Sequence, residues 1–300
     1  MEQLANNCHI CPRNCGVNRQ NGVLGTCHCG AKLSVARASL HMWEEPCISG
    51  ENGSGTIFFT GCNLGCVYCQ NAAISRGHAG KEITKERLLE IFFELKDQGA
   101  HNINLVTATH FLPAVLAAIQ KAKDQSIGIP FVYNCGGYEK VEMLKRAEGL
   151  IDIYLPDFKY WSPALSESYS SAADYQEVAK AAISEMVRQK PACTFNEKGM
   201  MTAGVLVRHM MLPGNLKDSK AVLSYLKSTF GDQLYISIMR QYTPPKEIEK
   251  QFPQLARTIR EQEYEKLIDY ALSLSITQAF VQEGEAASES FIPAFDGSGI

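Results

Sequence analysis

The sequence predicts an α/β domain built on a parallel sheet. Short apolar runs alternate with longer amphipathic segments through most of the 300 residues, and most connections between them are short. This alternation places helices against a parallel sheet. The predicted strands are residues 56–60, 103–108, 130–135, 151–157, 204–212 and 234–241. Six such units are too few for a closed eight-stranded barrel, so periodicity leaves a doubly wound sheet and an open barrel as alternatives.

The segments between these strands carry a helical pattern. In residues 83–98, apolar side chains such as Leu88 and Phe92 share the segment with charged ones such as Glu86 and Glu90, and Gly99 ends it. Further helices are predicted at residues 112–123, 140–147, 166–189, 218–230 and 252–274.

Composition narrows the classes of function. A hydrophobic content of 45% can form a large core, and a net charge of −3 with a pI near 6.2 argues against nucleic acid or an anionic membrane surface as partner. The start of the chain has no signal-peptide pattern, and the charge-poor residues 103–120 are too polar for a membrane span. We therefore expect a cytoplasmic protein. Seven of its eleven cysteines fall into two tight clusters, which favours metal ligation over disulfides.

The most informative stretch follows the first predicted strand. Cys62, Cys66 and Cys69 have the spacing Cys-x3-Cys-x2-Cys, with Gly61 and Gly65 allowing a tight loop. Cysteine thiolates hold four-iron clusters, usually four per cluster, so three leave one iron open to a small molecule. A structural zinc site or three buried cysteines is the alternative, but three cysteines on one loop need a distant fourth ligand to close a zinc site.

With Tyr68 before the third cysteine, this loop resembles the signature of radical S-adenosylmethionine (SAM) enzymes. Residues 62–71 resemble the pyruvate formate-lyase activating enzyme branch, particularly relatives with an added N-terminal cysteine motif. The resemblance implies a partial (β/α)6 barrel, a [4Fe-4S] cluster on the three cysteines and Tyr68 at the cofactor site. It also implies an oxidoreductase in which SAM chelates the fourth iron and is cleaved to methionine and a 5′-deoxyadenosyl radical. An electron donor such as flavodoxin or ferredoxin is implied as well.

Residues 1–50 are predicted to form a cysteine-rich metal-binding segment. Cys8, Cys11, Cys15 and Cys27 supply four thiols in a stretch rich in turn residues, which has little core of its own. Four thiolates suit tetrahedral zinc and a second closed iron–sulfur cluster equally well, so both metals stay open.

Polar residues at the predicted strand ends form the candidate cofactor site, because ligands of parallel folds bind there. Asp157 and Lys159 alternate onto one side of an extended chain, where a carboxylate and an ammonium can bind a zwitterionic ligand. They resemble the Asp-x-Lys motif of the activating enzymes. By the same resemblance, Arg208 binds the methionine carboxylate of SAM and Asn134 lies near the nucleoside.

The second strand departs from the activating-enzyme pattern. Its end reads Thr107-Ala108-Thr109-His110, where the resembled enzymes carry Gly-Gly-Glu to bind the SAM amino group. The hydroxyls of Thr107 or Thr109 could accept hydrogen bonds from an ammonium instead. For His110, an ordinary structural role and a catalytic one are open.

The substrate class follows from the same resemblance. The resemblance implies hydrogen abstraction from a glycine of a partner enzyme, with a peptide or a small metabolite as the alternative substrate. A non-catalytic iron–sulfur electron carrier or zinc protein is the alternative from another class. The barrel is expected over residues 51–284, followed by a tail, residues 285–300, that lies over the barrel mouth or is disordered.

Overall fold

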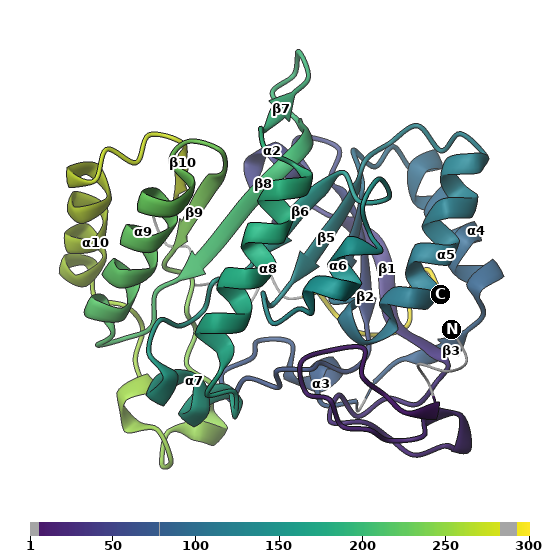
Figure 1. The fold of residues 1–300 in the computed structure, drawn as a ribbon, viewed down its shortest axis with the longest axis horizontal. Coiled ribbons are helices and arrows are strands. Elements are labelled where there is room, and N and C mark those ends of the chain that lie inside the picture. Colours follow the sequence, from purple (N-terminus) through teal and green to yellow (C-terminus); the bar gives the residue numbers. More distant parts are fainter. Residues whose placement is uncertain (1–5, 78, 283–292) are drawn as a thin grey trace.

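A computed structural model describes residues 6–77, 79–282 and 293–300. Its main sheet has the strand order β10-β9-β8-β6-β5-β4-β2-β1-β3. Figure 1 shows β10 and β9 at one side of this sheet and β1 and β3 at the other. The strands that run parallel to one another are β2 (Ser54–Phe59), β4 (Ile103–Val106), β5 (Phe131–Cys135), β6 (Ile153–Pro156), β8 (Met201–Met210), β9 (Tyr235–Met239) and β10 (Ala279–Val281). The six predicted strands are confirmed, and β10 is an addition.

The strand order decides between the two predicted architectures. In a doubly wound sheet the order reverses at a switch point. Here each parallel strand lies beside the next one along the chain, from β2 to β10, and the sheet stays open between β10 and the far edge. This winding is that of a partial barrel, which confirms the predicted fold class.

The helices cover the sheet between successive strands (Figure 1). They are α4 (Lys85–Asp97), α5 (Leu112–Asp124), α6 (Val141–Lys145), α7 (Pro163–Ser170), α8 (Tyr175–Gln189), α9 (Leu216–Phe230) and α10 (Glu261–Ser273), with short turns of helix at α2 (Pro46–Ser49) and α3 (Ala72–Ser75). None of the helices in the described part of the chain is long and apolar enough to cross a membrane.

Two predicted helices were too long. The chain breaks between α7 and α8 because Ser171 takes a left-handed conformation, with φ +46°, that ends α7. The helix predicted from residue 252 begins only at Glu261, because Pro253 starts a separate 3₁₀ turn at Pro253–Leu255.

The sequence analysis missed the strand β1 (Leu33–His41). It runs antiparallel to β2 and to the short strand β3 (Lys81–Ile83), so the main sheet begins inside the range assigned to the cysteine-rich segment. Before it, residues 7–32 consist of turns, irregular backbone and one 3₁₀ turn, Arg19–Asn21. A further short strand, β7 (Thr194–Phe195), pairs with the start of β8.

Candidate functional site

The three-cysteine loop leaves the sheet at the C-terminal end of β2. Gly61 donates its backbone N–H to Ile74, and Val67 donates to the Tyr169 carbonyl at the end of α7, so both ends of the loop are fixed. Tyr68 is buried among Tyr160, Tyr169 and Tyr242, with ring centroids 6.0 to 6.3 Å away. These edge-to-face contacts hold the loop against the barrel rim.

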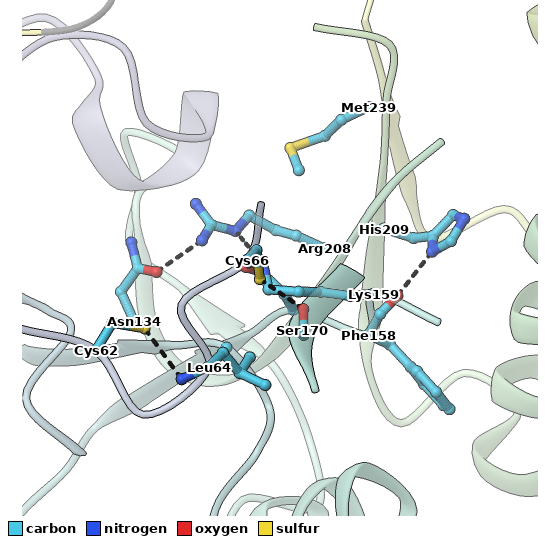
Figure 2. Close-up of polar contacts among 12 residues, drawn as sticks. Cys62, Leu64, Cys66, Asn134, Phe158, Lys159, Ser170, Arg208, His209 and Met239 are labelled. Carbon is cyan, nitrogen blue, oxygen red and sulfur yellow. Dashed lines mark hydrogen bonds and ion pairs between the residues drawn. The ribbon is translucent and has the colours of Figure 1, made fainter. Parts of the chain in front are cut away.

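The cysteine sulfurs of this loop lie in an environment suited to thiolates that bind a metal. The Cys66 sulfur accepts a hydrogen bond from the Ser170 hydroxyl at 3.0 Å, and the Cys62 sulfur accepts one from the Leu64 N–H at 3.4 Å (Figure 2). Burial raises the pKa of Cys62 to about 12, with the negative charge of Cys66 adding to the effect, and the same two causes raise the pKa of Cys69. A bound cationic metal centre would remove this cost of bringing three thiolates together.

The three thiols of this loop lie close enough to affect one another's charge, since the charges of Cys66 and Cys69 both raise the pKa of Cys62. Among residues 6–77, 79–282 and 293–300, no three His, Cys, Asp or Glu side chains are arranged to hold a single metal ion. A four-iron cluster places each thiolate on a different iron, so its ligands stand farther apart than those of one zinc ion. Three thiolates on one loop are a donor set that a four-iron cluster with one open iron takes.

A network of charges faces these cysteines across a cavity. Arg208 donates to Asp157 at 2.9 Å, to Asn134 at 2.7 Å and to Glu44 at 3.1 Å, and Lys159 donates to Asp157 at 2.5 Å. Figure 2 shows the Arg208 side chain extending toward Asn134, while His209 points away and bonds the Phe158 carbonyl at 2.7 Å. The residues lining this cavity include Cys66, Tyr68, Cys69, Asn134, Asp157, Lys159, Arg208, Glu44 and Pro293.

The network keeps its groups ionised despite their burial. Burial alone would raise the pKa of Asp157, but Arg208 and Lys159 together lower it below its usual value. Conversely, burial would lower the pKa of Lys159 and of Arg208, but the neighbouring carboxylates raise both. The cavity therefore holds two permanent cations and two carboxylates, Asp157 and Glu44, side by side.

Two predicted site residues lie elsewhere. The Thr109 hydroxyl donates to the buried carboxylate of Glu139 at 2.7 Å, and the Tyr133 hydroxyl donates to the same carboxylate at 2.8 Å. Burial raises the pKa of Glu139 to about 7. Neither Thr109 nor Thr107 is among the side chains that line the cavity.

Sequence reasoning missed Glu44. It lies in the connection between β1 and α2, where the glutamates carry no motif, and only the folded chain brings it to Arg208, which lies 164 residues away. Ser170 was missed for the same reason. Its hydroxyl reaches Cys66 because α7 ends beside the loop.

The N-terminal segment packs directly against the three-cysteine loop. Arg13 donates to the carbonyls of Asn63 and Leu64, and the Cys29 sulfur donates to the Thr60 carbonyl at 3.1 Å. His110 donates from Nε2 to the same Thr60 carbonyl at 2.7 Å, which gives it a structural position.

Cysteines of this segment also approach one another. A Cβ added at Gly25 would lie 3.3 Å from the Cys15 sulfur and 3.5 Å from the Cys27 sulfur. A hydrogen bond from Cys29 lowers the pKa of Cys27 to about 6, with Arg19 contributing against the opposing effect of burial. A metal on Cys8, Cys11, Cys15 and Cys27, either zinc or an iron–sulfur cluster, stays a prediction.

The described part of the tail lies along the first strand. Phe295 packs against Phe58 at 5.4 Å between ring centroids, and Ser298 accepts a hydrogen bond from the Ala38 N–H at 2.9 Å. Pro293 lines the cavity. Residues 285–292 of the predicted tail lie outside the described residues.

Comparisons with known proteins agree with this geometry. Residues 56–226 match the family model of the radical SAM superfamily. An uncharacterized protein of Methanocaldococcus jannaschii is 27% identical over 278 residues, covering 90% of this chain and 75% of its own.

Two solved structures are also similar. A domain of pyruvate-formate lyase-activating enzyme from Bacteroides vulgatus has a TM-score of 0.42 at 12% identity, covering 58% of this chain and 92% of its own. SuiB of Streptococcus suis, bound to its precursor peptide SuiA, has a TM-score of 0.49 at 12% identity, covering 74% of this chain and 46% of its own. Scores this low support no argument about substrate.

Proposed function

Because the chain belongs to the radical SAM superfamily, we propose that it is an oxidoreductase that binds a [4Fe-4S] cluster through Cys62, Cys66 and Cys69 and cleaves SAM. The observation that supports this most directly is the single cavity lined by Cys66 and Cys69 on one side and by Asp157, Lys159 and Arg208 on the other. With cluster and SAM bound, the site supplies a 5′-deoxyadenosyl radical that abstracts hydrogen from a substrate.

The charge network supplies partners for a zwitterionic sulfonium ligand. Arg208 has the planar fork that binds a carboxylate, and Lys159 adds a second positive charge beside it. Glu44 and Asp157 offer acceptors for an ammonium and offset the sulfonium charge. We propose that Glu44 binds the SAM amino group in place of the absent Gly-Gly-Glu stretch. The Thr109 hydroxyl is not available for this contact because it donates to Glu139.

The protein also shields the site from water. The cluster of tyrosines around Tyr68 is buried directly beneath the loop, and Phe58 and Met239 line the same cavity as the charges. Exclusion of water protects a reactive intermediate from side reactions.

For the substrate, we propose a glycine of a partner enzyme first and a peptide or small metabolite second. The support is the likeness of residues 62–71 to the activating-enzyme branch. A flavodoxin or ferredoxin is proposed as electron donor on the same ground.

The test is SAM cleavage by anaerobically reconstituted protein. With dithionite and SAM, the wild type should form 5′-deoxyadenosine, and Cys66→Ser should form none because it removes one cluster ligand. Arg208→Lys should raise the KM for SAM at least tenfold, since an ammonium cannot replace the two-point fork. Cys193→Ser, on a half-buried cysteine outside the cavity, is the control. A protein that carries four irons yet forms no 5′-deoxyadenosine would be an electron carrier instead.

A further inference from the structure

A second cavity of about 450 Å³ adjoins the proposed SAM site on the open side of the barrel. The two cavities share Trp43, Glu44, Arg208, Met239 and Gln241 as common walls. The second one continues away from the cysteines, between the connection that precedes α2 and the strands β9 and β10. A molecule bound there would therefore lie directly beside the proposed SAM site.

Two buried polar side chains, Glu45 and Ser237, lie side by side in the wall of this second cavity. Glu45 is only 9% exposed, and its carboxylate makes no hydrogen bond to α2, the helix that it precedes. Ser237 is 1% exposed, and its hydroxyl has no hydrogen-bond partner among the described residues. Buried polar groups are normally paired, so the unpaired Ser237 hydroxyl beside the Glu45 carboxylate points to a ligand that completes both.

The charges around Glu45 indicate the sign of that ligand. Three carboxylates, Glu44, Glu45 and Asp157, share the region with two cations, Arg208 and Lys159. Both cations are paired: Arg208 with Asp157 and Glu44, and Lys159 with Asp157. Over these five described groups one negative charge is in excess, and Arg208, the cation that acts on Glu45, is already paired with two other carboxylates. Burial raises the pKa of Glu45, a cost that a bound cation would offset.

The wall also contains Gln241 and Gln282, and its rim is apolar. Met42, Trp43 and Val281 are 43%, 61% and 42% exposed at its rim, and Phe280 lies beside them. Apolar and aromatic surface of this kind binds an alkyl stem and favours a cationic head group.

We propose that this cavity binds the substrate of the proposed radical reaction through an alkylammonium group, with the ammonium on Glu45 and Ser237 and the alkyl stem on the apolar rim. The proposal rests on the proposed function for its placement beside SAM. The shared chemistry has two sources: a lysine side chain of a protein or peptide, and a small aliphatic amine.

Calorimetric titration of the anaerobically reconstituted full-length protein, saturated with SAM, tests this with matched probes. Pentylamine, which is charged at neutral pH, should bind about tenfold or more tightly than neutral 1-pentanol. The tripeptide acetyl-Gly-Lys-Gly-amide should likewise bind more tightly than its norleucine counterpart. If the lysine peptide binds more tightly than pentylamine, the source is a protein lysine, and the reverse order identifies a small amine.

Variants connect the preference to the cavity. Glu45→Gln keeps the side-chain volume and should abolish the preference for the charged probes, and Ser237→Ala should weaken it without abolishing it. Glu51→Gln, on an exposed carboxylate outside this cavity, should leave it unchanged.

Equal binding of charged and neutral probes by the wild type would overturn the proposal, and so would a preference for charged probes that survives Glu45→Gln. An equal loss of SAM binding and amine binding in Glu45→Gln would also overturn it, because that result would place Glu45 in the SAM site. Measurement of 5′-deoxyadenosine after dithionite is added to the same samples separates this from the proposed function. If the protein cleaves SAM but shows no preference for the charged amine, only this inference is contradicted. If it prefers the charged amine but does not cleave SAM, the proposed function is contradicted.

Discussion

Two buried residues near the strand ends, His110 and Glu139, have charge states set by burial. Burial lowers the pKa of His110 to about 4 and raises that of Glu139 to about 7. Between pH 4.5 and 7 the unfolded chain has lost the Glu139 proton that the folded chain keeps, so this residue makes the free energy of unfolding fall as pH rises. Between pH 4 and 6.5 the unfolded chain holds a His110 proton that the folded chain lacks, so His110 makes the free energy of unfolding rise as pH rises. In the wild type the two effects largely cancel.

Single substitutions should separate the two contributions to the pH dependence of the free energy of unfolding. In Glu139→Gln, the free energy of unfolding should rise by roughly 3 kcal/mol from pH 4 to 6.5, and in His110→Gln it should fall by a similar amount from pH 4.5 to 7. Urea unfolding followed by circular dichroism at a series of pH values measures both. Glu249→Gln, on an exposed side chain, should follow the wild type. Parallel curves for all four proteins would show that the pKa values of His110 and Glu139 do not differ between the folded and unfolded chain.

At the scale of elements, the three-cysteine loop is confined between the barrel and the N-terminal segment. Gly61 has φ +86°, and a Cβ there would overlap the Cys27 carbonyl oxygen and the Cys29 sulfur. Gly65 has φ +59°, but a Cβ there would meet no atom within 4 Å. The two glycines of one loop therefore differ in packing and share a left-handed backbone.

This difference predicts unequal effects of the same substitution. Gly61→Ala should lower the free energy of unfolding by about 3 kcal/mol or more, because the chain must shift backbone as well as adopt a strained φ. Gly65→Ala should cost about 1 kcal/mol, for the backbone conformation alone. Urea unfolding and the iron content after anaerobic reconstitution measure the effects, with Gly61→Ala also expected to take up less iron. Equal losses for the two variants would mean that the N-terminal segment does not press on the loop.

At the scale of the whole molecule, Arg19 fastens the N-terminal segment to the barrel. This buried guanidinium donates to the Gly30 carbonyl at 2.8 Å and to the His110 carbonyl at 2.6 Å, and it stacks over Phe111 at 5.4 Å. One side chain thus joins residues that are far apart in the sequence.

Loss of this contact should loosen the segment. Arg19→Met should lower the free energy of unfolding by about 3 kcal/mol, because two buried carbonyls lose hydrogen bonds from a charged donor. It should also speed proteolytic cleavage within residues 6–32. Arg146→Met, on an exposed arginine, should change neither quantity. If Arg19→Met were cleaved no faster than the wild type, the segment would be held by other contacts.

Local pattern in the sequence determined the parallel sheet, because alternating strands and helices with short connections permit few other windings. It also indicated Asn134, Asp157, Lys159 and Arg208, since the C-terminal ends of neighbouring parallel strands meet at one edge whatever the details of packing, and all four line the cavity.

Only the tertiary structure decided how distant segments complete this site. Strand β1 adds an antiparallel edge, and the connection after it brings Glu44 and Glu45 to side chains more than 150 residues away, Arg208 and Ser237. The end of α7 places the Ser170 hydroxyl in hydrogen-bond contact with Cys66. The Thr109 hydroxyl is bonded to Glu139 and does not line the cavity. Such contacts depend on the relative placement of whole elements, and no local spacing in the chain records that placement.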